Sequence, residues 1–86
     1  MTHDTIDQQI RAILSEHGRL NKDAFALQAE DDLYQHGLTS HASVNLMLAL
    51  EGQFDLEFPD HLLNRSVFSS IESIRSALIE LTAAAG

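Results

Sequence analysis

A serine with histidines and carboxylates near it is the first combination in this chain that could do chemistry. The set comprises Ser40, His36, His41, Asp31 and Asp32. A serine hydrolase places its nucleophile in a strand-to-helix turn with glycines at fixed places on both sides. The stretch 37–42 reads GLTSHA and does not supply those glycines. We therefore expect no hydrolase, and the chain offers no other coherent catalytic set.

Histidines and carboxylates could also bind a metal ion. The five histidines are His3, His17, His36, His41 and His61. None of them forms the one-turn pair of a zinc-binding helix, and the chain has no cysteine. The alternating carboxylates and fixed glycine of a calcium loop are missing as well. We predict no metal site and expect solvated histidines, of which His36 and His41 give a mild pH sensitivity near Ser40.

Ser40 on its own has two interpretations. Serine is among the favoured N-terminal caps of helices, and a capping serine needs no other function. The same position suits a covalently attached phosphate, because backbone N–H groups and the helix dipole stabilise negative charge at a helix N-terminus. Gly37 makes the approach to Ser40 flexible, as a modification site requires. The residue types alone leave this choice open.

The helix that presents this serine is predicted from Ser40 to Gln53. Its apolar side chains cover most of the circumference at about 100° per residue, and they are Val44, Leu46, Met47, Leu48, Leu50 and, just beyond, Phe54. They leave a narrow small-residue stripe of Ala42, Asn45, Ala49 and Gly52. We predict that this helix is central, and that the stripe either packs closely against another helix or docks a partner.

Two more helices are predicted from apolar residues at helical spacing. The first is marked by Ile6, Ile10, Ile13 and Leu14, with Gly18 as its stop, and the last by Ile71, Ile74, Leu78 and Leu81. Ser69 and Glu72 have the spacing of a capping box for the last helix. Residues 19–39 predict a long packed loop that carries function or a short helix.

The remaining segment and the lack of strand patterns complete the predicted fold. Pro59 makes 54–59 irregular, and 60–64 predicts one short helix. No alternating run of β-branched residues predicts a strand. We predict an all-α four-helix bundle with three main helices, one short helix and a long first loop. Its expected core residues are Val44, Leu48, Phe54, Phe68, Ile71 and Leu78.

Composition limits the size of the protein and the partners it would attract. Its 86 residues predict one domain, 1–86, with a small core. Thirteen acidic residues against five basic ones give a net charge of −8, which argues against nucleic acid. The charge would steer a basic protein surface toward the chain, or it would only keep the chain soluble.

Cysteine content and hydropathy bear on the chemistry and the compartment. Without cysteine, any thiol that this chain uses must be added to it. No secretory signal is recognised, and the apolar run from Leu46 to Leu50 is far too short to span a bilayer. We expect a cytoplasmic protein without membrane contact. We also expect a monomer, because no long heptad pattern is present.

Four stretches of sequence stand in a fixed register around Ser40. They read DLY at 32–34, GLTS at 37–40, VNLMLALEGQF at 44–54 and FPD at 58–60. In this register, residues 31–74 resemble the acyl carrier protein family, in which a serine opens the second helix and receives 4'-phosphopantetheine. The resemblance implies a carrier-protein bundle. It also implies that Ser40 anchors the arm.

The same resemblance implies a function without catalysis. A free-standing carrier would hold an acyl or aminoacyl group as a thioester on the arm. Its partners would be a phosphopantetheinyl transferase, an acyl- or amino acid-activating ligase and a downstream acyltransferase. The cargo would be a fatty or polyketide-type acyl group or an amino acid. The alternative from another class is a cofactor-free helical interaction module in which Ser40 is only a cap.

The chain departs from this family on both sides of Ser40 and along the following helix. Thr39 and His41 stand where the family usually has aspartate and leucine, and the small-residue stripe stands where carboxylates are usual. The predicted docking residues are therefore Thr39, His41, Ala42, Asn45, Ala49 and Gly52. Two acidic runs flank them: Asp23, Glu30, Asp31 and Asp32 form the first, and Glu51, Asp55, Glu57 and Asp60 the second. We expect a specialised partner that contacts the stripe and is steered by these runs.

Overall fold

The fold is built from three α-helices and three short 3-10 helices. A computed structural model describes residues 3–85. In chain order the elements are α1 (His3–His17), η1 (Ala24–Ala26), η2 (Leu33–His36), α2 (Ser40–Phe54), η3 (Asp60–Leu62) and α3 (Ile71–Ala85). No strand occurs in this part of the chain. The predicted all-α architecture is confirmed, and the short helix expected at 60–64 is a single 3-10 turn.

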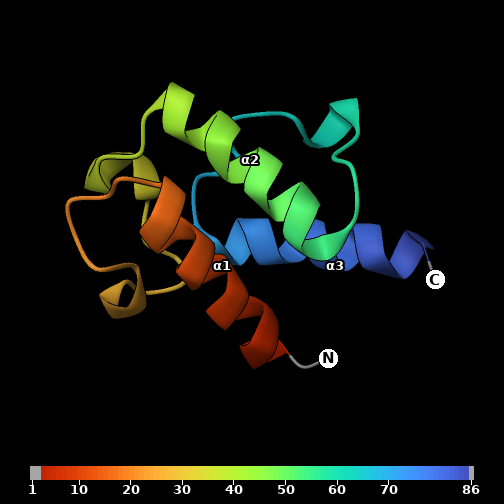
Figure 1. Cartoon of the computed structure of the whole chain (residues 1–86), viewed down its shortest axis with the longest axis horizontal. Helices are drawn as coiled ribbons and strands as arrows, with labels where there is room; N and C mark the ends of the chain where they lie inside the picture. The colour runs from red at the N-terminus through yellow and green to blue at the C-terminus, as the bar shows by residue number, and fades with distance from the viewer. Residues whose placement is uncertain (1–2, 86) are drawn as a thin grey trace.

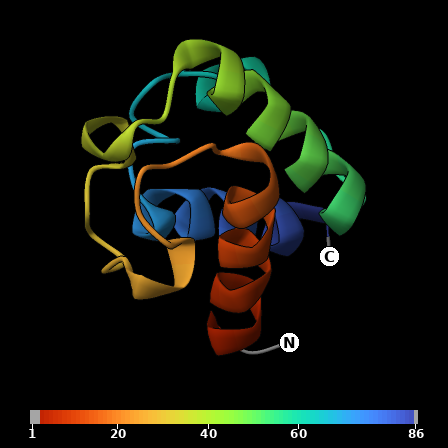
Figure 2. The ribbon, with the colours of Figure 1, turned by 60° about the vertical axis from the view of Figure 1, so that its left-hand side comes forward.

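Helices α2 and α3 both pack against α1. Figure 1 shows the axis of α2 inclined in much the same way as that of α1, with α2 overlapping α3 near its own C-terminal end, while the long connection from α1 to α2 closes one end of the bundle. In the turned view of Figure 2, α2 arches over α1 and α3. The start of α2 therefore lies at the end of the molecule that the long connection covers.

The core is formed where the three helices face one another. Its fully buried large side chains are Ile10, Leu14, Leu33, Leu46, Leu50, Ile71, Ile74 and Leu78. Of the residues predicted for the core, Phe68, Ile71 and Leu78 are buried, and Phe54 is half-buried against it.

The prediction for Val44 and Leu48 is wrong, because their side chains are 51% and 55% exposed. The helix is apolar around most of its circumference, so periodicity did not determine which face packs inward. Ala42, Leu46 and Leu50 form the buried face. A helix with a small residue at such a contact approaches its neighbour closely.

The long connection between α1 and α2 is ordered by side chains that bind its backbone. Asp23 and Asp32 cap η1 and η2, accepting the backbone N–H groups of Phe25 and Tyr34 at 3.0 Å each. Arg11 on α1 donates to the carbonyls of Ala24 at 2.8 Å and Leu27 at 2.6 Å. The segment predicted as a loop therefore contains two short helices, and η1 is held against α1.

The start of α3 is capped by a different pair of residues from the predicted one. Ser70 and Ser73 form the reciprocal cap, since each hydroxyl accepts the backbone N–H of the other residue at 3.1 Å. The Ser69 hydroxyl instead donates to the Ser66 carbonyl. The predicted Ser69–Glu72 pair is wrong by one residue, because Ser70 has the same spacing to a side chain that can also cap.

Candidate functional site

Ser40 is the first residue of α2, and its hydroxyl is not used to hold that helix. The neighbouring Thr39 is the cap, because its Oγ1 accepts the Ala42 N–H at 3.0 Å. Within residues 3–85 the Ser40 hydroxyl makes no hydrogen bond, and its side chain is exposed. The interpretation of Ser40 as only a helix cap is therefore wrong. The adjacent Thr39 has a hydroxyl that can also cap the helix, and it is the residue that does so.

The turn that leads into Ser40 is held in position, and the flexible approach predicted from Gly37 is not found. Gly37 has φ +102°, a left-handed conformation that glycine adopts without strain. Its N–H donates to the carbonyls of Leu33 and Tyr34, the first two residues of η2, and the next residue, Leu38, is 4% exposed in the core. The serine thus projects from a point anchored on both sides, by Leu38 before it and by α2 after it.

The electrostatic surroundings of Ser40 suit a phosphate. The first turn of α2 contains no acidic residue, and Thr39 provides the cap without a carboxylate. The N-terminal N–H groups of a helix carry a partial positive charge that stabilises an attached anion. A phosphodiester on the Ser40 oxygen would therefore meet this dipole with no carboxylate on the adjacent residues. These features fit a phosphopantetheine group.

A groove of about 480 Å³ lies beside Ser40, between α2 and the segment that follows η3. We call it the Ser40 groove. It is lined by Tyr34, Ser40, Ser43, Val44, Met47, Leu63, Asn64, Arg65 and Phe68. Its wall is mainly apolar, while serine, asparagine and arginine side chains supply polar groups. Local sequence patterns did not indicate this groove, because Leu63 to Phe68 are far from Ser40 along the chain.

Tyr34 and Arg65 meet in two ways within this groove. The Tyr34 hydroxyl donates to the Arg65 carbonyl at 3.2 Å, and the Arg65 guanidinium carbon lies 3.7 Å from the ring centroid. Burial raises the pKa of Tyr34 above its usual value, although the charge of Arg65 and a hydrogen bond with Ser43 act in the opposite direction. The raised pKa disfavours loss of the phenolic hydrogen that Tyr34 donates to Arg65.

The residues predicted to dock a partner do not form one outward face. Thr39, His41, Asn45 and Gly52 are exposed, but Ala42 is 3% exposed and Ala49 is half-buried against the core. Ala42 is thus wrong as a docking residue. The small-residue stripe is split, because its two alanines allow α2 to pack on its neighbours.

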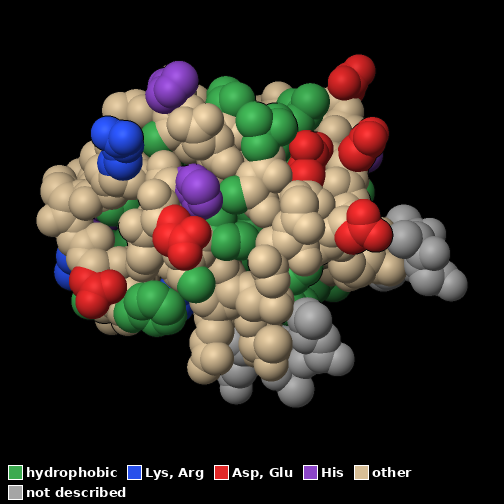
Figure 3. All heavy atoms as spheres, viewed as in Figure 1, with side chains coloured by type: hydrophobic (Ala, Val, Ile, Leu, Met, Phe, Trp, Pro, Cys, Tyr) green, Lys and Arg blue, Asp and Glu red, His purple; other side chains and the backbone are tan. Residues whose placement is uncertain are grey.

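The exposed face of α2 also carries large apolar side chains. Val44 and Leu48 lie there, and Leu63, 46% exposed, follows η3. Figure 3 shows hydrophobic side chains gathered over α2 on the visible face. Leu63 lines the Ser40 groove together with Val44. Patterning on one helix did not indicate this arrangement, because Leu63 reaches the groove only through the tertiary fold.

The two acidic runs differ in how many of their carboxylates bind the backbone. Four of their carboxylates accept backbone N–H groups: those of Asp23, Asp31, Asp32 and Glu51. The other four, Glu30, Asp55, Glu57 and Asp60, are exposed, and within residues 3–85 no hydrogen bond or ion pair of their carboxylates is found. Figure 3 shows acidic side chains on the side where the chain leaves α2 and approaches η3. The charge left for a partner is mainly in the second run.

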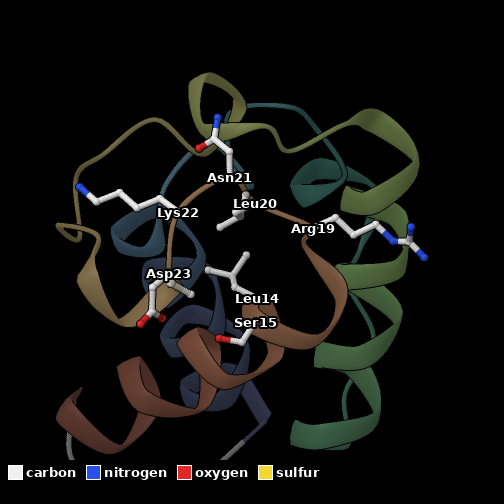
Figure 4. Close-up of a pocket in the computed structure, with 8 residues that line it drawn as sticks. Leu14, Ser15, Arg19, Leu20, Asn21, Lys22 and Asp23 are labelled. Atoms are coloured by element: carbon white, nitrogen blue, oxygen red, sulfur yellow. The ribbon is translucent and has the colours of Figure 1, made fainter.

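A separate hollow of about 390 Å³ lies between the end of α1 and residues 19–24. Figure 4 shows Leu14 and Leu20 near its centre, with the Arg19 and Lys22 side chains directed outward. Ser40 is not among its lining residues. This hollow therefore has no part in the chemistry at Ser40.

In the described part of the chain, no group of three or more histidine, aspartate or glutamate side chains could hold a metal ion. Among the helices of that same part, none has the length and apolar character needed to cross a membrane. The histidines predicted to be near Ser40 differ in exposure: His41 is exposed, while His36 is half-buried.

Comparison with protein families gives one match that covers most of the chain. Residues 8–78 match the family described as "Phosphopantetheine attachment site". An aminoacyl carrier protein from Agrobacterium fabrum is 49% identical over 69 residues, which are 80% of this chain and 83% of that protein.

Solved structures show the same similarity. A chain in the crystal structure of an engineered Bradyrhizobium japonicum glycine:[carrier protein] ligase, complexed with a carrier protein from Agrobacterium tumefaciens and ATP, superposes with a TM-score of 0.85 at 45% identity. The match covers 88% of this chain and 99% of that one. A chain in the Bradyrhizobium japonicum ligase complex with glycylated carrier protein gives a TM-score of 0.73 at 28% identity, covering 86% and 99%.

Proposed function

The chain belongs to the phosphopantetheine-attachment family, and we propose that Ser40 is the residue to which its 4'-phosphopantetheine is attached. When bound, this group supplies a thiol on which an acyl or aminoacyl cargo is held as a thioester. A carrier of this kind needs an added thiol because the chain has no cysteine. The observation that supports Ser40 most directly is its free hydroxyl at the start of α2, next to a threonine that already caps the helix.

The protein's own residues present the attachment point. Thr39 holds the first turn of α2, and Leu38 anchors the preceding backbone in the core. Ser40 therefore offers its oxygen from a rigid support to a phosphopantetheinyl transferase. No residue of the chain is assigned a catalytic role. We propose that residues 1–86 act as one carrier domain that presents its cargo to other enzymes.

The attachment is tested by intact mass. The protein is incubated with coenzyme A and a broad-specificity phosphopantetheinyl transferase, and wild type is compared with Ser40→Ala. Ser43→Ala is the matched control, because Ser43 lies one turn along α2 and lines the same groove. We expect one arm on wild type and Ser43→Ala, and none on Ser40→Ala. A folded wild type that gains no mass with any transferase would overturn the proposal.

We further propose that the cargo is an amino acid. The 49% identity to an aminoacyl carrier protein supports this, as do the similar chains in glycine:[carrier protein] ligase complexes. The Ser40 groove agrees, because it is bordered by the exposed side chains of Val44, Asn64 and Arg65. A groove open at such residues shields a long apolar chain poorly, whereas a small polar cargo does not need that shielding.

The proposed partners are therefore an amino acid-activating ligase, which loads the arm, and a downstream acyltransferase, which removes the cargo. The loaded-arm protein is incubated with ATP, an amino acid:carrier protein ligase and a mixture of amino acids. We expect one aminoacyl mass increment that is released by hydroxylamine. Loading by a fatty acyl ligase, with no acceptance of any amino acid, would contradict the proposed cargo.

A further inference from the structure

Arg65 is the one basic side chain that lines the Ser40 groove. The other four basic residues lie elsewhere: Arg11 binds two carbonyls of the long connection, Arg75 pairs with Asp7, and Arg19 and Lys22 line the separate hollow. The chain has a net charge of −8, so a cationic side chain in the groove of the attachment residue runs against its overall excess of acidic residues. Its surroundings indicate what it binds.

The backbone of Arg65 is held by the turn around it. The Asn64 side chain donates to the His61 carbonyl and accepts the Val67 N–H, both at 3.1 Å. The Tyr34 hydroxyl donates to the Arg65 carbonyl from across the groove. Tyr34 itself is placed by η2, whose cap is Asp32. The segment that carries Arg65 is thus tied to the element just before Ser40.

The side chain of Arg65 is held by the same tyrosine. Its guanidinium lies 3.7 Å from the Tyr34 ring centroid, and such stacking uses the face of a cation. The N–H donors of a guanidinium lie in its plane, and stacking leaves them available to an anion. No carboxylate forms an ion pair with Arg65 among residues 3–85. Asp32, the acid next to Tyr34, is engaged by the Tyr34 N–H instead.

We propose that Arg65 binds the phosphodiester of the arm attached to Ser40. This inference rests on the proposed function, because the anion exists only once Ser40 is loaded. A phosphodiester presents oxygens that match the planar donors of arginine. With the phosphate paired there, the start of the arm lies along the apolar wall of the groove. Arg65 is a positioning residue, and it takes no part in bond making.

The proposal is tested on fully loaded protein by nuclear magnetic resonance. Loading of each variant is first confirmed by intact mass. The Nε–Hε signal of Arg65 is then compared between the unloaded and loaded forms, at low salt and at about 1 M salt, where the screening length falls to roughly 3 Å. The Arg19 signal serves as the internal control. The mobility of the arm's methyl groups is measured in wild type, Arg65→Gln, Arg65→Lys and the charge-matched control Lys22→Gln.

We expect loading to shift the Arg65 signal, high salt to reverse that shift, and Arg19 to stay unchanged. Arg65→Gln should lower the equilibrium constant between the arm lying in the groove and the arm free in solvent by roughly two- to fivefold, the range of an exposed ion pair. Arg65→Lys should lower this constant less, and Lys22→Gln should leave it unchanged. A loaded wild type whose Arg65 signal does not move overturns this inference alone. Failure of wild type to gain mass overturns the proposed function with it.

Discussion

Thr39 caps α2 with its hydroxyl, and the neighbouring Ser40 is thereby left with a hydroxyl that bonds to nothing in residues 3–85. The two residues are adjacent and chemically similar, so either could have taken the cap. The Thr39 Oγ1 lies 3.0 Å from the Ala42 nitrogen. The division of roles leaves an exposed oxygen at the positive end of a helix dipole, where a phosphate is stabilised.

This division predicts different stabilities for two neighbouring substitutions. Thr39→Ala removes the cap and should lower the free energy of unfolding by about 1 kcal/mol. Ser40→Ala removes no hydrogen bond and should change it by less than about 0.5 kcal/mol. Thr39→Asp should keep the stability, because aspartate also caps. Urea unfolding monitored by circular dichroism measures all three. A larger loss for Ser40→Ala than for Thr39→Ala would contradict the assignment.

The corrected core of α2 predicts a contrast between two leucines. Leu46→Ala empties a site that is 0% exposed and should cost about 2–5 kcal/mol. Leu48→Ala truncates a side chain that is 55% exposed and should cost less than about 0.5 kcal/mol. Urea unfolding of both variants tests this contrast. Equal losses would mean that α2 packs with a different face inward.

Asp7 and Arg75 predict a moderate contribution from one ion pair between α1 and α3. One Arg75 nitrogen reaches the two Asp7 oxygens at 3.0 and 2.9 Å, and both side chains are largely covered. Breaking such a pair should cost more than an exposed one and less than a fully buried one, about 1–2 kcal/mol. Asp7→Asn, Arg75→Gln and the double variant would measure the coupling by urea unfolding. Loading at Ser40 should be unchanged, since neither residue lines its groove.

The raised pKa of Tyr34 predicts a loss of stability in alkali. The folded protein holds the phenolic proton more tightly than the unfolded chain, whose tyrosine ionises near 10.0. The unfolded state therefore binds fewer protons above that pH, and stability falls as the pH rises. The contribution is fully present below about pH 10. Melting temperatures across this range should fall less steeply in Tyr34→Phe, and equal slopes would disprove the assignment.

The second acidic run predicts an effect on encounter with partners. Glu57→Lys with Asp60→Lys reverses two exposed carboxylates that bind nothing in the described structure. Loading by a partner that is steered by charge should become slower and less dependent on salt, since steering acts on the association rate. Glu16→Lys, at the C-terminal end of α1 and outside both acidic runs, is the control. Rates that match wild type at every salt concentration would show that this run only keeps the chain soluble.

Much of this protein was determined by its local sequence. Apolar residues at helical spacing predicted α1, α2 and α3, and the register of DLY, GLTS and FPD around Ser40 indicated the family that the comparison then showed. These features are local, because a helix period or a short motif is written in consecutive residues. Ser40 was also identified from this register, but the sequence did not show that Thr39 caps α2 in its place.

The tertiary structure decided the features that depend on neighbours. Which face of α2 is buried could not be determined from a helix that is apolar nearly all round, and packing placed Ala42 inside and Leu48 outside. The choice between Thr39 and Ser40 as cap depended on backbone angles at the turn. The Ser40 groove required residues 31 positions apart, Tyr34 and Arg65, to meet. Such contacts arise only when the chain folds back on itself, so no periodicity in the sequence records them.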